Sequence, residues 1–400
     1  MVDHKVAFGP ARATDLDPSR ASRGQGLYAA LDLGTNNCRL LIARPADGGL
    51  QAVDSFSRIV RLGENLSGTG RLGEGAIART LAALRICRDK IAAHGVTRSR
   101  LIATEACRAA SNGAEFLDCV RQRAGLDIEI VDRGTEARLA AEGCAALADD
   151  LAEGIVLFDI GGGSSEIVWL ERDRSDDAAG SVRDRIRAWT SLPLGVVSLA
   201  DRFGGRTVTA DSFAAMVAYV EEALAPFAAE VRHQARCGRF HLLGTSGTVT
   251  TIAGVFLGLS RYERRRIDGL WMSRTEVDAS IARVRAMPFA DRVAHGCIGP
   301  DRADLVLGGC AILEALRRVF PSDRLRIADR GLREGMLIQM MRRDGVWPPG
   351  PQRASAATGE MRPRPPTRRR PGARADGRSR RGSRRRESGR CRRPCGSVAS

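Results

Sequence analysis

The stretch IVLFDIGGGSSEIVWL at residues 155–170 decides the predicted fold. Two short apolar runs rich in β-branched residues, 155–160 and 167–170, flank a turn of glycines and serines. This pattern predicts two antiparallel strands joined in a buried hairpin. Glycines carry no Cβ, so backbone N–H groups in such a turn can approach an anion closely, and serine hydroxyls add donors. The candidate phosphate ligands in this turn are Gly161, Gly162, Gly163, Ser164 and Ser165.

Two acidic residues flank the same turn, Asp159 at the end of the first strand and Glu166 at the start of the second. Because these carboxylates would repel a bare phosphate, we expect a hard divalent cation between them and the ligand, with Mg²⁺ as the default. A glycine-rich hairpin with two solvated acids is the alternative. For an isolated run of glycines, the two interpretations are equally good.

A second copy of the pattern favours the phosphate site. The segment YAALDLGTNNCRLLIARP at residues 28–45 aligns with it without a gap and places Asp32 on Asp159, an offset of 159 − 32 = 127 residues. Asp32 becomes a third candidate metal ligand. The repeat predicts two duplicated domains whose phosphate loops face each other across a cleft. The candidate phosphate ligands of this copy are Gly34, Thr35, Asn36, Asn37 and Arg39.

A third candidate anion site follows the predicted strand 240–243. Residues 244–248, GTSGT, open a helix that reaches about residue 256, and the first turn of a helix favours negative charge. Its candidate ligands are Gly244, Ser246, Gly247 and Thr248. None of the three motifs is a Walker A loop, because no Gly-Lys-Ser/Thr follows, and neither hairpin turn opens a helix as a dinucleotide-binding turn must.

Strands and helices alternate around both hairpins, which predicts an α/β fold with mixed sheets. We expect a disordered segment at 1–26, a first domain at 27–150, a second at 151–345 and a disordered tail at 346–400. Further strands are predicted at 50–62, 101–104, 128–131, 188–192 and 325–328. Further helices are predicted at 74–94, 113–124, 134–148, 196–203, 212–233, 275–286, 302–319 and 330–341.

The net charge of +16 belongs mainly to the tail. Residues 351–400 contain 16 arginines and 3 acids, a net of +13, which leaves +3 for residues 1–350. Such a tail is equally typical of non-specific RNA or polyanion binding by counterion release and of a solvated extension without a role. The nearly neutral body argues against a nucleic-acid-binding enzyme.

The other composition features exclude several classes of protein. The ten cysteines form no Cys-x-x-Cys pair, so neither a zinc site nor a disulfide framework is expected. The N-terminus lacks an apolar signal core, and no run approaches the roughly 18 apolar residues of a membrane helix. We therefore expect a cytoplasmic protein without a membrane segment; the sequence leaves a homodimer open.

At these motifs the sequence resembles the exopolyphosphatase and guanosine pentaphosphate phosphatase family, part of the actin, sugar-kinase and Hsp70 superfamily. The resemblance covers about residues 27–343. Its ordered motifs are DLGTNNCRLLIA at 32–43, the segment 105–112, GTEARL at 134–139, FDIGGGSSE at 158–166, LLGTSGT at 242–248 and ADRGLREGML at 328–337.

The resemblance implies two actin-like, ribonuclease H-like domains with phosphates and Mg²⁺ bound in the cleft. It makes Asp159 and Glu166 metal ligands, Glu136 the base that activates water, and Arg108 a grip on the phosphate chain. Without the resemblance, Glu136 is more simply a first-turn helix acid favoured by the dipole. Thr135 stands where many members have a further acid, and the C-terminal His-Asp type domain of long members is absent.

The expected function is Mg²⁺-dependent removal of terminal orthophosphate from inorganic polyphosphate, with pppGpp as the alternative substrate. A kinase or ATPase of the same superfamily is one rival, and a polyanion-binding protein that acts through its tail is another. We expect polyphosphate to be the better substrate, because no aromatic residue lies within the three phosphate motifs to stack on a base.

Overall fold

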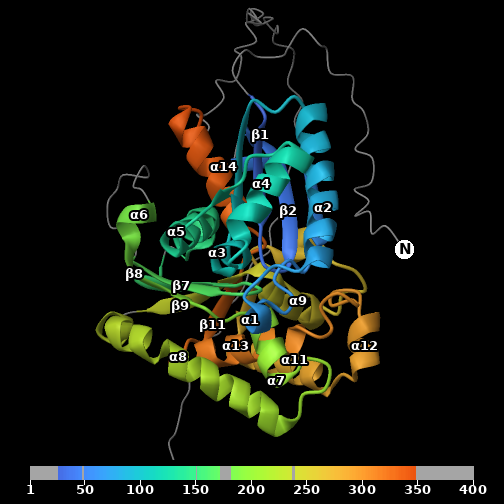
Figure 1. Ribbon diagram of the computed structural model, residues 1–400. Coiled ribbons are helices and arrows are strands. Elements are labelled where there is room, and N and C mark those ends of the chain that lie inside the picture. The colour runs from blue at the N-terminus through green and yellow to red at the C-terminus, as the bar shows by residue number, and fades with distance from the viewer. Residues whose placement is uncertain (1–25, 47–48, 150, 172–181, 237–238, 348–400) are drawn as a thin grey trace, which may run out of the picture. The chain divides into compact units, whose positions relative to one another are not determined.

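The computed structural model describes residues 26–46, 49–149, 151–171, 182–236 and 239–347. The segments predicted to be disordered at 1–26 and 346–400 lie outside these residues, apart from 26, 346 and 347. The described residues form two β-sheets with helices on both faces of each (Figure 1).

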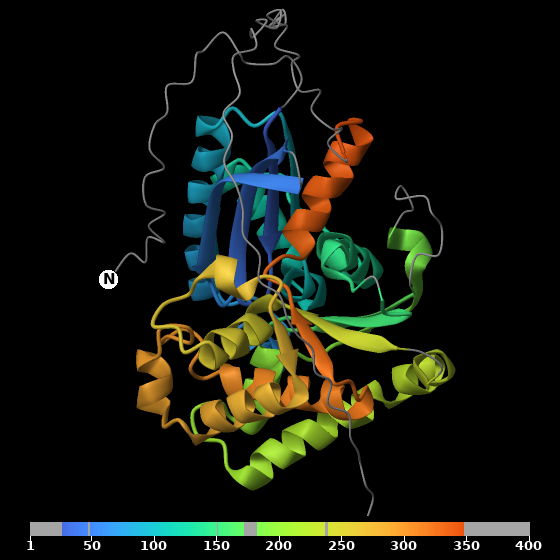
Figure 2. The ribbon, with the colours of Figure 1, turned by 180° about the vertical axis from the view of Figure 1, so that it is seen from behind.

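The first sheet has five strands in the order β3-β2-β1-β4-β5. Strands β1 (Tyr28–Leu33), β2 (Asn37–Ala46) and β3 (Gly49–Ile59) form an antiparallel meander. β4 (Arg98–Ala103) pairs parallel with β1, and β5 (Glu129–Ile130) pairs parallel with β4. Alternate residues of β1 point to opposite faces. Ala29 and Leu31 pack with α2 (Glu74–Ala93) and α4 (Gly113–Ala124), whereas Ala30 packs with α14 (Leu332–Arg343) (Figure 2).

The second sheet has six strands in the order β10-β11-β9-β6-β7-β8. They are β6 (Gly154–Ile160), β7 (Ser165–Glu171), β8 (Ile186–Leu192), β9 (Phe240–Thr245), β10 (Trp271–Ser273) and β11 (Arg324–Ile327). Val156 and Phe158 of β6 join the largest core, with α8 (Ala210–Arg236), α9 (Ser246–Phe256), α11 (Arg274–Ala286) and α13 (Val306–Val319). Ile155 and Leu157 point to the other face, toward α5 (Arg133–Cys144).

Helices α5 and α14 pack against each other, with α14 against β1 and α5 against β7 and β8. Glycines let them approach: a Cβ on Gly143 would lie 2.0 Å from the carbonyl oxygen of Gly331, and one on Gly335 would lie 2.0 Å from that of Leu139. These two helices therefore form the layer between the sheets. The division of the chain into domains at residues 150 and 151 stays a prediction.

The two predicted hairpins are confirmed, with Asp32 opposite Arg39 in β1–β2 and Asp159 opposite Glu166 in β6–β7. Their turns close in the same way. Gly34 N donates to Asn37 O at 2.9 Å, and the aligned Gly161 N donates to Ser164 O at 3.0 Å. The mixed sheets also confirm the predicted fold class.

Most predicted elements agree with the structure within a few residues, but two helices differ. The helix predicted at 302–319 begins at Val306, because 302–305 form turns, and the helix predicted at 134–148 ends at Cys144 before one 3₁₀ turn (Ala145–Leu147). Short elements lack enough residues to show a period. Those that the sequence did not predict are α1 (Leu66–Thr69), α3 (Glu105–Ala109), α6 (Val182–Arg185), α10 (Arg264–Ile267), α12 (Phe289–Ala294) and β10. Helix α7 (Val196–Phe203) matches its prediction.

One helix of the described residues, α8, is long and apolar enough over Ala210–Arg232 to cross a membrane by length and composition alone. Glu221 and Glu222 interrupt this helix, so it is not a continuous apolar run of the length that the sequence analysis excluded. Phe213, Met216 and Val220 of this helix are buried in the core of the second sheet, which accounts for its apolar face.

Candidate active site

The two phosphate loops, 34–37 and 161–164, contact each other directly. A Cβ on Gly162 would lie 3.0 Å from Thr35 Cβ, and one on Gly163 would lie 2.7 Å from Thr35 Oγ1. None of the glycines at 161–163 has a positive φ, so the backbone conformation of the turn does not itself require glycine. At Gly162 and Gly163 the first loop occupies the space of a side chain, whereas a Cβ on Gly161 would lie 2.7 Å from Ser164 O of its own turn. The loops therefore meet along one edge instead of facing each other across an open cleft.

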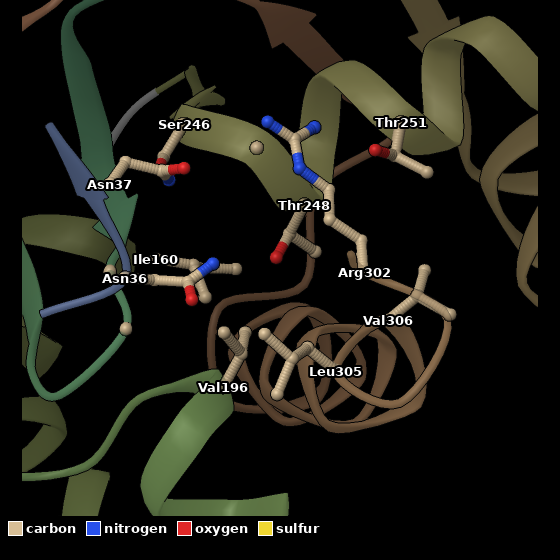
Figure 3. A pocket seen from close by; sticks show the side chains of 13 residues that line it. Asn36, Asn37, Ile160, Val196, Ser246, Thr248, Thr251, Arg302, Leu305 and Val306 are labelled. Carbon is tan, nitrogen blue, oxygen red and sulfur yellow. The ribbon is translucent and has the colours of Figure 1, made fainter. Parts of the chain in front are cut away.

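A pocket of roughly 440 Å³, open solvent included, lies beside this contact (Figure 3). Asn36 and Asn37 line it from the β1–β2 turn, and the side-chain Oδ1 atoms of both are buried without a hydrogen-bond partner. An unpaired buried amide is costly, and a 180° flip would present its N–H groups instead. These amides are suited to bind oxygens of a ligand in the pocket.

The start of α9 forms another wall of the pocket. Ser246, which has a φ of 80°, directs its hydroxyl to Asp159. A Cβ on Gly247 would lie 3.4 Å from the Arg302 guanidinium, so Arg302 lies over the first turn of α9. The guanidinium of Arg302 makes no hydrogen bond or ion pair with any described residue, and its charge is therefore available to an anion. Thr248 also lines the pocket, as predicted.

Two predicted phosphate ligands have other partners. The Ser165 hydroxyl is fully buried and donates to Leu194 O at 2.9 Å, so it is not free to bind phosphate. Gly244 lies within β9, where a Cβ would meet the Phe158 ring at 2.7 Å. The absence of a side chain at Gly244 leaves room for the Phe158 ring. Ser164 bonds to Glu166 and helps to hold that carboxylate.

Four carboxylates gather where the two sheets face α5 and α14. Asp32 shares a face of β1 with Ala30, and Asp159 shares a face of β6 with Leu157, so both acids point into that layer. Glu166 lies opposite Asp159 on β7, and its Oε1 accepts from Ser191 Oγ at 2.8 Å. Glu136 comes from the first turn of α5.

These carboxylates have raised pKa values. Burial raises the pKa of Asp159 to about 6, opposed by the charge of Arg39 and reinforced by that of Asp32. Burial also raises the pKa of Glu166 to about 7, and the charge of Asp159 adds to the effect. Burial and then the charge of Glu166 raise the pKa of Glu136 well above its usual range. Without a cation, the cluster thus resists full ionisation.

The donor set fits a hard divalent cation. Among the described residues, no three His, Cys, Asp or Glu side chains stand close enough to hold a metal ion by themselves. Mg²⁺ usually binds one or two carboxylates and keeps waters or substrate phosphates as its other ligands. Asp159, Glu166 and Asp32 therefore suit a cation that is completed by substrate oxygens better than a closed protein cage.

Arg108 lies beside Glu136. Its Nη2 donates to Glu136 Oε2 at 3.1 Å and to Glu105 Oε2 at 2.5 Å, and its Nη1 donates to Val131 O at 2.7 Å. Arg133 also pairs with Glu105, at 2.9 Å. Arg108 is therefore not a surface arginine. Its predicted contact with the phosphate chain stays a prediction, and its observed contact is with the candidate base.

Two further arginines point to the same region as Arg39. The Arg39 side chain makes no hydrogen bond or ion pair with any described residue, and its charge acts on Asp32 and Asp159. Sequence reasoning missed Arg302 and Arg333. Burial raises the pKa of Asp32, and the charges of Arg39 and Arg333 oppose that rise. Arg333 is part of the quoted motif ADRGLREGML, but the motif alone does not show which arginine reaches the site.

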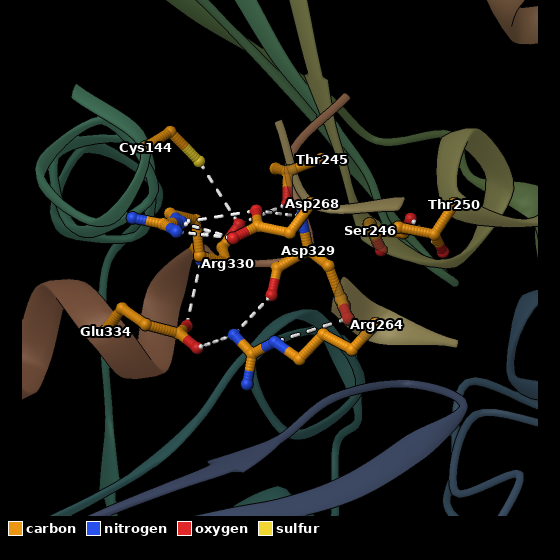
Figure 4. Close-up of polar contacts among 10 residues, drawn as sticks. Cys144, Thr245, Ser246, Thr250, Arg264, Asp268, Asp329, Arg330 and Glu334 are labelled. Carbon is orange, nitrogen blue, oxygen red and sulfur yellow. Dashed lines mark hydrogen bonds and ion pairs between the residues drawn. The ribbon is translucent and has the colours of Figure 1, made fainter. Parts of the chain in front are cut away.

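Other residues of that motif form a network of polar contacts with neighbouring elements (Figure 4). Glu334 accepts from Arg264 Nη2 and from Gly331 N, both at 2.9 Å. The carbonyl oxygen of Arg330 accepts from Thr245 Oγ1 at 2.6 Å and from Cys144 Sγ at 3.2 Å. This network joins the end of β9, the end of α5 and the start of α14.

The model of the Ppx/GppA phosphatase family matches residues 41–344. The chain belongs to this family. It is accordingly a phosphoanhydride hydrolase, and the predicted resemblance is confirmed. The glycine loops, the buried carboxylates and the unpaired arginines described above are the parts such an enzyme needs.

Named relatives fall into two groups. Exopolyphosphatase 2 of Mycobacterium tuberculosis is 28% identical over 327 residues, which cover 78% of this chain and 98% of the relative. The guanosine-5'-triphosphate,3'-diphosphate pyrophosphatase of Photobacterium profundum is also 28% identical, over 79% of this chain. The match spans only 59% of that longer protein.

Solved structures support the actin-like fold. The Aquifex aeolicus member of the Ppx/GppA protein family is 27% identical with a TM-score of 0.63, over 80% of this chain and 99% of that one. An exopolyphosphatase-like protein is 29% identical with a TM-score of 0.70, over 80% of this chain and 98% of that one. The predicted architecture is thereby confirmed.

Proposed function

We propose that this enzyme removes terminal orthophosphate from inorganic polyphosphate. The observation that carries the proposal is the position of Glu136, buried at the start of α5 and bonded to Arg108 among three other carboxylates. A buried carboxylate with a raised pKa is a better base than an exposed one, so Glu136 is suited to accept the proton of an attacking water.

We assign phosphate binding to the loops and to arginines whose side chains make no hydrogen bond or ion pair with described residues. The amides of Asn36 and Asn37, the start of α9 and the guanidinium of Arg302 line one pocket, and Arg39 lies beside the carboxylates. Hydrolysis of a phosphoanhydride depends mostly on aligned groups and on positive charge around the phosphoryl oxygens. This arrangement supplies both along a linear chain of phosphates.

Mg²⁺ is the proposed cofactor. Asp159 and Glu166, with Asp32 nearby, would hold it, and it would neutralise charge on the phosphate oxygens. The raised pKa values of Asp159 and Glu166 support this assignment, because carboxylates that crowd together in a buried site are stabilised in their ionised form by a cation.

One observation favours pppGpp as the alternative substrate. Four aliphatic side chains line the same pocket, and such a wall can pack against a purine ring. They are Ile160, Val196, Leu305 and Val306. No aromatic residue lines this pocket, however, and a linear polyphosphate needs only repeated anion contacts. We therefore keep polyphosphate as the better substrate.

The test is a comparison of kcat/KM for long polyphosphate, tripolyphosphate and pppGpp with Mg²⁺ present. We expect both inorganic substrates to exceed pppGpp. A higher kcat/KM for pppGpp than for either polymer would assign the aliphatic wall to the base and overturn the ranking. Absence of phosphate release from all three substrates would reject the proposed function itself.

We also propose a cytoplasmic location. It is supported by the cysteines that the structure describes, which are all free thiols, including Cys38 and Cys87, whose sulfur atoms lie 4.0 Å apart. Free thiols are typical of proteins of a reducing compartment. RNA or polyanion binding by the tail and a homodimer stay predictions.

A further inference from the structure

Arg61, in the loop after β3, reaches from the first sheet to a turn of the second-sheet region. Its Nη1 donates to Asp304 Oδ2 at 2.9 Å, and its Nη2 donates to Asp304 Oδ1 at 3.0 Å. Nη2 also donates to Asp301 O at 3.2 Å. A bidentate ion pair of this kind fixes the orientation of both side chains as well as the distance between them.

The backbone of Arg61 is fixed on the first phosphate loop. Arg61 N and Val60 N both donate to Asn36 O, at 3.1 Å and 2.9 Å, and Gly63 N donates to Thr35 O at 2.9 Å. Arg61 has a φ of 47°, in the left-handed region that a non-glycine residue holds only when its surroundings impose it. The backbone of Arg61 is therefore held on the loop that carries Asn36.

Asp304 is equally fixed on the other side. Arg292, which is 3% exposed, donates to Ala303 O at 2.7 Å and to Gly205 O at 3.2 Å. A Cβ on Gly205 would lie 1.8 Å from Asp304 O, so the two segments are in close contact. The turn that contains Asp304 also contains Arg302, the arginine of the pocket.

A second bond spans the same two regions. Ser67 Oγ of α1 donates to Asp201 Oδ2 of α7 at 2.9 Å. The start of α7 in turn holds the second phosphate loop, because Val196 N donates to Gly161 O at 3.0 Å and Val197 N to Gly162 O at 2.8 Å. Both bonds thus join a segment that supports the first loop to a segment that supports the opposite wall.

We propose that Arg61 is a positioning residue for substrate, and that its pair with Asp304 sets the spacing between Asn36 and Arg302. A phosphate chain bound by both walls needs that spacing to be constant. Arg61 itself touches no substrate. The inference rests on the proposed function only in that the pocket binds a phosphate chain; the bonds between the two regions do not depend on it.

The expected effect is on KM more than on kcat. Arg61→Ala should raise KM for tripolyphosphate about fivefold, the upper range for loss of a partly exposed ion pair, and change kcat less than about twofold. Glu136 and Arg108 are not in contact with Arg61, so the chemical step is spared. Asp304→Asn should act in the same direction.

A charge exchange separates this role from simple loss of a side chain. The double variant Arg61→Asp with Asp304→Arg should recover most of the KM, since aspartate tolerates the left-handed backbone of position 61. The matched control is Arg121→Ala on α4, where the arginine pairs with exposed Asp118 and Asp127. It should leave KM unchanged.

Amide hydrogen exchange without substrate gives a readout that needs no activity. In Arg61→Ala and in Asp304→Asn, the amides of residues 60, 61 and 63 should exchange faster, and those of β1 should not. Unchanged KM and unchanged exchange in both folded variants would overturn the proposal. If the unaltered protein released no phosphate, the proposed function would fail, while the exchange result would still decide the role of Arg61.

Discussion

Removal of divalent cations should make the stability of this protein strongly dependent on pH. Asp159 and Glu166 have pKa values of about 6 and about 7 in the folded chain, against ordinary values of 3.8 and 4.5. An acid whose pKa is raised on folding contributes stability that is fully present below the unfolded pKa and is lost as pH rises through the folded pKa. The cation-free protein should therefore be more stable at pH 5 than at pH 8.

The size of the effect follows from the same values. A pKa raised from 4.5 to about 7 corresponds to about 3 kcal/mol of free energy of unfolding. Asp159 and Glu166 titrate as a pair, so their two contributions are not independent and we take about 3 kcal/mol for both together. For a folded part of this size, that loss lowers the melting temperature by about 5 °C between pH 5 and pH 8.

The assay is thermal unfolding with EDTA and with Mg²⁺ across this pH range. Mg²⁺ binds the ionised carboxylates, so it should restore stability at pH 8 and add little at pH 5. Glu166→Gln should flatten the pH dependence, and Glu222→Gln on the exposed side of α8 should not. Equal stability at pH 5 and pH 8 in EDTA, or a Glu166→Gln variant with unaltered pH dependence, would refute the reasoning.

Three further predictions follow from the site, the helix layer and the tail. Asp159→Asn should raise the Mg²⁺ concentration needed for half-maximal activity, and an unchanged metal titration would place the cation elsewhere. Gly335→Ala should lower the free energy of unfolding by about 1–3 kcal/mol, because its Cβ would meet the carbonyl oxygen of Leu139. Gly68→Ala is the control, since open space surrounds that position, and urea unfolding should show a far smaller loss. A chain that ends at residue 347 should hydrolyse tripolyphosphate at the same rate as the full chain but bind long polyphosphate more weakly at low salt; equal affinities would leave the tail without this role.

The sequence predicted the hairpins because their determinants are local. The period of two, the glycine turns and the 127-residue repeat gave the pairings of Asp32 with Arg39 and of Asp159 with Glu166. The same alternation could have placed Asp32 and Asp159 on inward faces. It could not show that α14, the last helix, packs on the first sheet, since that depends on contacts between distant segments.

Local sequence patterns could not identify the arginines at positions 61 and 302. Arg302 lies in a turn and Arg61 follows a strand, and neither position has a period or a motif that marks a ligand. Arg61 is placed by its bond to Asp304, 243 residues away in the chain, and Arg302 is placed by the packing of its turn against the start of α9. The sequence explained Gly163 by the close approach of an anion to the backbone, and the structure adds a second reason for glycine there, the close approach of Thr35.

The central claim is that Glu136 activates the water that attacks the terminal phosphate. The most direct measurement is phosphate release from tripolyphosphate by Glu136→Gln, with Glu142→Gln, a buried glutamate of the same helix, as control. We predict a loss of at least about 100-fold for Glu136→Gln, with polyphosphate binding retained, and a nearly normal rate for the control. A loss of less than about tenfold for Glu136→Gln would contradict the account.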